Sequence, residues 1–425
     1  MGSKRLPFLK RIYRWLDSGD HFRRYAPQAA PATPGGRPKV AICNLIPNLG
    51  DTVMTFPLLD ALRRENPHLE ISVFTQGNGS FLGNHPALDC LYLMKQRQRN
   101  IFRKIPLLPV VLCWWQHWRG LRFHTVVVLR GGVDPYRSHH LAWLLGGATR
   151  VAYSPKLEPE RPECQYDVDS LFTELVTEMK GIHEASRGSE VLQRAGLLKG
   201  SIPLNQVVES VLTIAQTPSN HSYLQQFDLT VGSYAVVALG ASVPRRAWPV
   251  TSFVELTRRE IVPRDWKIVL VGGPELASSS REFKGIMEKE NCSLAGRIID
   301  LTGKTNFEQL AGVCGLASCF VGNDSGPAHI AGACGVPALI VTAFAASGRA
   351  SHHASPHRSR PLGPRVAIVQ PAEQMEPCIT ECVATEAHCI KQVSVDKAAE
   401  TLQKLLQRSS EDENAPAEGH SFLNV

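Results

Sequence analysis

The sequence predicts an α/β protein built from two Rossmann-like, doubly wound domains. Three observations predict this fold class. The chain has 425 residues, more than one typical hydrophobic core holds. Short apolar segments alternate with helical patterns, as in parallel sheets. A polar stretch at 218–221 separates two such series, so we expect a first domain over 38–217 and a second over 218–407.

The apolar segments predict ten strands in two series. The first series is 40–43, 71–75, 91–94, 126–129 and 151–153. The second series is 235–239, 268–271, 298–301, 320–321 and 339–341. Ligands of doubly wound sheets bind outside the carboxyl ends of the strands. The residues that follow each strand are therefore the candidates for chemistry.

The composition is that of a globular protein, with 43% hydrophobic and 20% charged residues. A formal net charge of +7 favours anionic partners such as phosphates, acidic glycolipids or nucleic acid. The eleven cysteines lack the dense spacing of a small secreted scaffold, and no secretory signal opens the chain. We therefore expect the protein to reside in the reducing cytoplasm. No apolar run reaches the roughly 18 residues of a membrane span.

Two segments lie outside the two domains, and a third segment inside the first domain has an unusual composition. Residues 1–37 predict a basic amphipathic helix at 6–16 and a linker rich in proline and glycine. This helix either docks on an anionic membrane surface or packs on its own domain. Residues 101–118 combine tryptophans with cations, which suits either a membrane interface or a core helix of the first domain. Residues 408–425 predict a disordered tail.

Asp51 is the candidate general base. It follows the first expected strand, at a turn into a helix whose start we place at Pro57. The amides and dipole of a helix N-terminus keep a nearby carboxylate ionised, which suits a base that faces an incoming hydroxyl. The alternative is an aspartate that only caps the helix.

The second domain holds the candidate anion sites. A turn of small residues, Gly240, Ala241 and Ser242, lets backbone amides approach a phosphate, and Arg245 or Arg246 follows as a cation. The alternative is an arginine pair on the solvated surface. Glu275, after the next strand, either binds a ribose diol or is solvated. The strand at 320–321 leads into the sharpest signal, a turn before a helix of small residues that carries Asp324, Ser325, Gly326 and His329.

The helix N-terminus after that turn is suited to anions, and Asp324 can accept hydrogen bonds from sugar hydroxyls. A tight structural turn is the alternative. Thr305 and Glu308 predict a capping box at the start of another helix. A further group, Cys378, Cys382, His388 and Cys389, lacks the usual spacing of zinc ligands, so we favour buried reduced thiols over a metal site.

Taken together, these segments resemble glycosyltransferase family 9, the ADP-heptose:lipopolysaccharide heptosyltransferases of Gram-negative bacteria. The resemblance spans about residues 38–408. It is carried by Leu49-Gly50-Asp51, Ala247-Trp248-Pro249, 300–305, Asn323 to His329 with Gly335-Val336-Pro337, and the cysteine-rich end at His388-Cys389 with a closing helix over 395–406.

The resemblance implies a GT-B fold, with two Rossmann-like domains facing across a cleft, and an inverting transfer that needs no metal or other cofactor. It makes Asp51 the base for the acceptor hydroxyl. Arg246 takes the place of a phosphate-binding lysine, and Asp324 contacts the donor. The diphosphate end of the donor is lined by Ser325, Gly326 and His329.

The implied partners are a nucleotide-sugar donor and a lipid-linked acidic glycan acceptor, with no nucleic acid. The implied location is the cytoplasm. If the chain docks on a membrane, the implied surface is the cytoplasmic face of the inner membrane. The leading hypothesis is heptose transfer from ADP-heptose to an inner-core lipopolysaccharide acceptor. Arg246 replaces the lysine that the family usually has, and Ile46-Pro47-Asn48 before Leu49 replaces small hydroxyl residues that the family precedes with an arginine. Two alternatives stay open. These are a GT-B transferase with another nucleotide sugar for a different cell-surface glycan, and a non-catalytic nucleotide-sugar binding protein.

Overall fold

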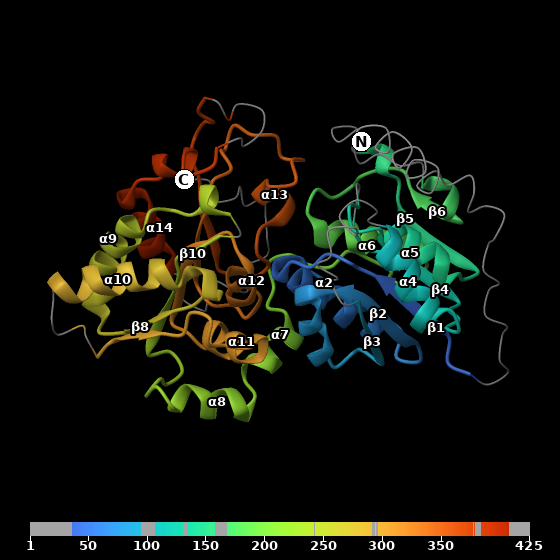
Figure 1. Cartoon of the computed structure of the whole chain (residues 1–425), viewed down its shortest axis with the longest axis horizontal. Helices are drawn as coiled ribbons and strands as arrows, with labels where there is room; N and C mark the ends of the chain where they lie inside the picture. Colours follow the sequence, from blue (N-terminus) through green and yellow to red (C-terminus); the bar gives the residue numbers. More distant parts are fainter. Residues whose placement is uncertain are drawn as a thin grey trace, which may run out of the picture. The chain divides into compact units, whose positions relative to one another are not determined.

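The computed structural model describes residues 36–94, 107–130, 134–157, 168–241, 243–290, 294, 296–376, 378 and 384–407. The expected N-terminal helix at 6–16 and the expected tail at 408–425 lie outside the described residues. The chain divides into two compact units, Met1–Ile202 and Pro203–Val425. In each unit helices flank a twisted sheet, as Figure 1 shows.

The first unit contains a six-stranded sheet of order β3-β2-β1-β4-β5-β6. All neighbouring strands are parallel. The strands are β1 (Lys39–Cys43), β2 (Glu70–Gln76), β3 (Cys90–Met94), β4 (Thr125–Val128), β5 (Thr149–Tyr153) and β6 (Glu174–Val176). This strand order is that of the dinucleotide-binding Rossmann fold.

The second unit repeats the same topology, with sheet order β12-β11-β10-β7-β8-β9 and only parallel neighbours. The strands are β7 (Tyr234–Ala238), β8 (Lys267–Leu270), β9 (Ile298–Asp300), β10 (Cys319–Asn323), β11 (Ala338–Val341) and β12 (Val366–Val369). Numbered within the unit, this order is again 3-2-1-4-5-6. The expected α/β class with two Rossmann-like sheets is confirmed.

All ten expected strands are present, and two edge strands, β6 and β12, escaped the sequence analysis. The three residues of β6 are all partly exposed, and β12 alternates between buried and partly exposed residues. Central parallel strands appear as continuous apolar runs because both of their faces are covered. An edge strand lacks this signal.

Helices cover both faces of the first sheet. On one face α2 (Leu49–Glu65) packs against α6 (Glu184–Arg194). On the other face α4 (Leu107–Cys113), the π-helical turn η3 (Trp114–Trp118) and α5 (Ser138–Leu145) bury a core with Ala41 and Cys43 of β1. Because strand side chains alternate between faces, Val40 and Ile42 point toward the α2 face.

The second sheet is covered in the same way. On one face lie α9 (Val250–Glu260), α10 (Ala277–Glu290) and α14 (Val395–Gln407), which pack over the core of β7, β10 and β11. On the other face α11 (Phe307–Gly315) packs against three helices, α7 (Glu209–Ala215), α8 (Pro218–Gln225) and α12 (Gly326–Ala333). Helices α7 and α12 also contact each other. The expected closing helix over 395–406 is therefore present as α14.

Two helices begin at other residues than the sequence analysis expected. Helix α2 begins at Leu49, and Pro57 lies inside it. A proline in a helix costs about 3 kcal/mol through one lost hydrogen bond and a clash, but α2 buries nine residues that offset this cost. The expected capping box at Thr305 and Glu308 is shifted by one residue, since Asn306 and Gln309 form it.

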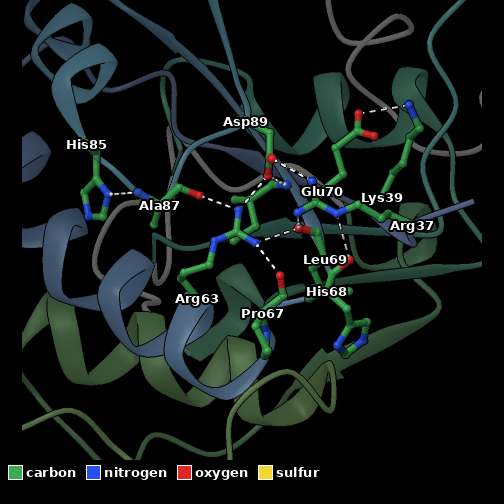
Figure 2. A network of polar contacts seen from close by, with 11 residues as sticks. Arg37, Lys39, Arg63, Pro67, His68, Leu69, Glu70, His85, Ala87 and Asp89 are labelled. Carbon is green, nitrogen blue, oxygen red and sulfur yellow. Dashed lines mark hydrogen bonds and ion pairs between the residues drawn. The ribbon is translucent and has the colours of Figure 1, made fainter.

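A polar network closes the amino end of the first sheet (Figure 2). The guanidinium of Arg63 donates to the backbone oxygen of Ala87 at 2.6 Å and to the carboxylate of Asp89 at 2.6 Å. Asp89 also accepts hydrogen bonds from Arg37 and from the backbone N–H of Ile71. Partial burial acts to raise the pKa of Asp89, but these donors hold it below its usual range. The network joins the starts of β1, β2 and β3, and so lies at the end of the sheet opposite the carboxyl ends of the strands.

The tryptophan-rich segment has one buried and one exposed tryptophan. Trp118 is buried in the core of the first unit. Trp115 is 58% exposed, and the Arg119 guanidinium lies 4.9 Å from the centre of its ring. Within the described ranges, no helix combines the length and the apolar character needed to cross a bilayer.

Candidate functional site

In both sheets the strand order reverses between the first and fourth strand of the unit. In doubly wound sheets, ligands bind at this switch point, outside the carboxyl ends of the strands. Asp51 follows β1 and Arg130 follows β4 in the first unit. In the second unit, Arg246 follows β7 and Asp324 follows β10. Asp51, the candidate base, and Asp324, in the sharpest motif of the sequence, therefore both lie at switch points.

Asp51 lies in the first turn of α2, where the chain leaves β1. One carboxylate oxygen, Oδ1, accepts a hydrogen bond of 3.2 Å from Nη1 of Arg130. The other, Oδ2, accepts one of 3.2 Å from the side-chain amide of Asn48. The side chains of Asp51 and Arg130 are each 20% exposed. The carboxylate is thus oriented by two donors and still open to solvent.

Arg130 was not among the sequence-based candidates. Burial acts to lower the pKa of its guanidinium, but the carboxylates of Asp51, Glu184 and Asp134 raise the pKa above its ordinary value. Arg130 is therefore a permanent cation beside Asp51. A neighbouring cation favours the ionised form of a carboxylate, which is the form that accepts a proton.

A pocket in the first unit opens around this pair. It is lined by Asn44, Ile46, Asp51, Met54, Thr55, Leu58, Leu129, Arg130, Glu184 and Ala185. The side-chain amide of Asn44 donates to the hydroxyl of Thr55 at 3.0 Å. Its Oδ1 is buried and has no hydrogen-bond partner within the described part of the chain. A hydroxyl that enters this pocket finds hydrogen-bond acceptors at Asn44 and at the carboxylate of Asp51.

Asn323 joins the two motifs of the second unit. This residue ends β10 and is fully buried. Its Oδ1 accepts a hydrogen bond of 2.8 Å from the backbone N–H of Trp248, and its Nδ2 donates to the backbone oxygen of Leu239 at 2.9 Å. The indole N–H of Trp248 donates to the oxygen of Val393. The segment that carries Arg246 is thereby held against the end of β10.

Asp324 follows directly, and its side chain is 25% exposed. An oxygen of its carboxylate lies 3.9 Å from Nε2 of the buried His329. Ser325 is the N-cap of α12, which begins at Gly326, and the hydroxyl of Ser325 donates to the backbone oxygen of Asn323 at 3.1 Å. All four sequence candidates of this motif thus lie where β10 leads into the start of α12.

A pocket in the second unit brings Arg246 and Asp324 together. Its other lining residues are Arg245, Thr342, Ala343, Phe344, His352, His353, Ala354, Gln374, Cys378, His388 and Cys389. The Nε atom of Arg245 is buried without a hydrogen-bond partner among the described residues. Two guanidinium groups, one of which has an unsatisfied donor, favour an anionic ligand.

The remaining donor candidates lie apart from this lining. Gly240 is in close contact with Leu276, since a Cβ at position 240 would lie 2.2 Å from that side chain. The structure thus explains Gly240 by packing. Ala241 is partly buried, Ser242 lies outside the described residues, and Glu275 is exposed on a short 3-10 helix, η9 (Pro274–Leu276).

Several pocket residues were missed by sequence reasoning. Thr342 directly follows β11, so the rule that ligands bind after strand ends could have found it. His352 stacks on Phe344 with ring centres 5.1 Å apart. Both precede the short helix α13 (Pro356–Ser359), in an irregular segment whose sequence has no periodicity.

The thiol and imidazole group near the C-terminus is partly assembled. Cys378, His388 and Cys389 each place one ligand atom within 4.8 Å of the others. Cys382, the fourth member of the sequence-based group, lies outside the described residues.

Comparison with known proteins finds relatives of this chain. The profile of glycosyltransferase family 9 (heptosyltransferase) matches residues 178–388. Lipopolysaccharide heptosyltransferase 3 of Escherichia coli is 23% identical in an alignment of 313 residues, and this alignment covers 70% of this chain and 81% of that protein. The chain contains a family 9 glycosyltransferase domain. The matched range contains Arg246, Asp324 and the whole pocket of the second unit except Cys389, whereas Asp51 precedes it.

Solved structures of other family 9 enzymes share the fold. A family 9 glycosyltransferase from Veillonella parvula superposes with a TM-score of 0.63 at 19% identity, covering 89% of this chain and 99% of that one. The E. coli heptosyltransferase WaaC, solved with ADP, gives 0.62 at 15% identity, covering 86% and 99%. A second structure of WaaC holds ADP-2-deoxy-2-fluoro heptose. The expected resemblance to family 9 is confirmed.

Proposed function

We propose that this glycosyltransferase transfers a heptose from ADP-heptose to an inner-core lipopolysaccharide acceptor. The observation that carries the proposal is the pocket of the second unit, where Arg246 and Asp324 meet at the sheet's switch point. The names of the relatives support the choice of substrates, since they include a lipopolysaccharide heptosyltransferase and an enzyme solved with ADP and with an ADP-heptose analogue.

The second unit is proposed to bind the donor. The guanidinium groups of Arg245 and Arg246 neutralise the diphosphate, and the carboxylate of Asp324 accepts hydrogen bonds from sugar hydroxyls. Ser325, Gly326 and His329, at the start of α12, are proposed for the diphosphate end of the same donor. We keep Gly240, Ala241, Ser242 and Glu275 as further donor candidates outside the pocket lining.

The first unit is proposed to activate the acceptor. The carboxylate of Asp51 removes the proton of the acceptor hydroxyl, and the oxygen attacks the anomeric carbon of the heptose. The bond from this carbon to the β-phosphate oxygen breaks, and ADP leaves with the electron pair. One displacement inverts the anomeric configuration. We propose that this transfer needs no divalent metal, because arginines can neutralise the leaving group.

Nucleotide release with a panel of donors tests the substrate assignment. ADP-heptose, UDP-sugars and GDP-sugars are each offered with deacylated lipopolysaccharide core fragments as acceptors, in buffer with and without Mg²⁺. The proposal expects ADP release that depends on the acceptor and does not depend on Mg²⁺. Release from a UDP- or GDP-sugar alone would replace the donor and keep the fold and family.

We further propose that the enzyme works at the cytoplasmic face of the inner membrane, where a lipid-linked acceptor is reached. The exposed ring of Trp115 beside Arg119 motivates this location, since tryptophans and cations favour the membrane interface. Trp115→Ser should reduce cosedimentation with anionic vesicles. Unchanged cosedimentation would remove Trp115 from the proposal.

A further inference from the structure

The strongest feature that the transfer reaction does not use is the sulfur and nitrogen cluster between β12 and α14. Cys378 and Cys389 are buried, and His388 is partly buried. Each offers one ligand atom, and the three atoms all lie within 4.8 Å of one another. Thiolate and imidazole are the ligands that zinc prefers in protein sites.

The backbone holds two of these ligands in place. The N–H of Met375 donates to Sγ of Cys389 at 3.4 Å, and the carbonyl of Met375 accepts a hydrogen bond of 2.7 Å from the N–H of Cys378. Met375 thus connects both cysteines. Backbone N–H groups that point at sulfur stabilise the negative charge of a thiolate, which is the form that binds metal.

The spacing is close to that of a tetrahedral zinc site. With Zn–S bonds of about 2.3 Å and Zn–N bonds of about 2.0 Å, neighbouring ligand atoms lie roughly 3.5 to 3.8 Å apart. Sγ of Cys389 lies 3.5 Å from Nδ1 of His388. Small side-chain rotations therefore bring the three atoms around one ion. Without an ion, the same distance fits a thiol that hydrogen-bonds to imidazole, and these two states differ in measurable ways.

The cluster also has a defined place in the fold. Cys378, His388 and Cys389 line the same pocket as Arg246 and Asp324. They belong to the segment that leaves β12 and returns to the short 3-10 helix η11 (Cys389–Gln392) before α14. Between 370 and 388 this segment has no regular secondary structure among its described residues. An ion would cross-link Cys378 to His388 and Cys389.

We propose that Cys378, His388 and Cys389 bind one zinc ion, which ties this segment to the wall of the pocket. Both thiols lose their protons when the ion binds, and the imidazole binds in its neutral form. A water molecule or a further donor completes the tetrahedron. This ion is structural, and the proposed transfer does not pass through it. This proposal departs from the expectation of buried reduced thiols that the sequence spacing favours.

Metal analysis of the full-length protein tests the site without any measurement of transfer. Protein purified without chelator should contain about one zinc per chain by mass spectrometry of the metal. Cys378→Ser and Cys389→Ser should each lower this content roughly tenfold. Cys90→Ser is the matched control, because Cys90 is a partly buried thiol at the start of β3, and it should keep the ion.

Cobalt substitution covers the case in which the serine variants do not fold. Wild-type protein stripped of zinc and given Co²⁺ should show the ligand-field bands of a tetrahedral site and a thiolate-to-cobalt charge-transfer band, and added Zn²⁺ should abolish both. Wild-type protein that holds no zinc and shows no charge-transfer band overturns the proposal and leaves a hydrogen-bonded thiol and imidazole.

Discussion

The side-chain oxygen of Asn323 accepts a hydrogen bond of 2.8 Å from the backbone N–H of Trp248, 75 residues earlier in the chain. The amide of the same side chain donates to the backbone oxygen of Leu239. One buried side chain therefore fixes the loop that presents Arg246. This contact relates two family motifs that the sequence shows only as separate segments.

Asn323→Ala should lower the free energy of unfolding by about 1 to 3 kcal/mol, because it leaves a buried N–H and a buried C=O without their partner. Denaturant titration measures this change. Asn78→Ala, at an exposed position on η2 (Gly77–Asn84), is the control and should have little effect. Equal stability of Asn323→Ala and wild type would contradict the assigned role.

Arg246→Ala should weaken ADP binding more than adenosine binding, because the lost interaction is with the diphosphate. A hydrogen bond between charged groups contributes about 1.5 to 3 kcal/mol, so we expect ADP affinity to fall by roughly 10- to 100-fold. Calorimetric titration with both ligands measures the difference. Arg258→Ala, which removes an exposed arginine paired with Glu255, should change neither affinity. A matching loss for both ligands would place Arg246 away from the diphosphate.

His140 makes the first unit sensitive to acid. The pKa of His140 is lowered to about 3, chiefly by burial within α5 and also by the charges of Arg137 and His139, while Asp134 acts to raise it. The unfolded chain therefore takes up a proton near the ordinary value of 6.5, and the folded chain does not. Stability contributed by neutral His140 is present above pH 6.5 and is lost as the pH falls toward 3.

Between pH 6.5 and 5 this loss amounts to about 2 kcal/mol. His140→Gln keeps a neutral polar side chain and should remove that part of the pH dependence, as seen by denaturant titration at several pH values. His68→Gln, at an exposed position, should retain the wild-type dependence. An unchanged slope in His140→Gln would mean that His140 is protonated in the folded state.

The sequence predicted the parts of the site that depend on local pattern. Apolar runs located the central strands, and the residues after them include Asp51, Arg246 and Asp324. Pro57 misplaced a helix start, because burial along α2 outweighs the local cost of proline. Edge strands β6 and β12 were missed, since partly exposed strands lack a continuous apolar run.

The long-range contacts could not be predicted from pattern alone. Arg130 directly follows an expected strand, but nothing in the sequence pairs it with Asp51, 79 residues away. His352 and Phe344 lie in an irregular segment whose course is set by packing. The sequence spacing of Cys378 and His388 argued against a metal site, whereas the fold brings their ligand atoms close together.

The role of Asp51 as base is the central claim, and single-turnover transfer by Asp51→Asn tests it most directly. Asparagine preserves the shape of the side chain and removes the base, so turnover should fall by roughly 100- to 10,000-fold with unchanged donor affinity. Asp60→Asn, a matched change in the same helix, should keep most of the activity. Transfer by Asp51→Asn at the rate of wild type would contradict the account.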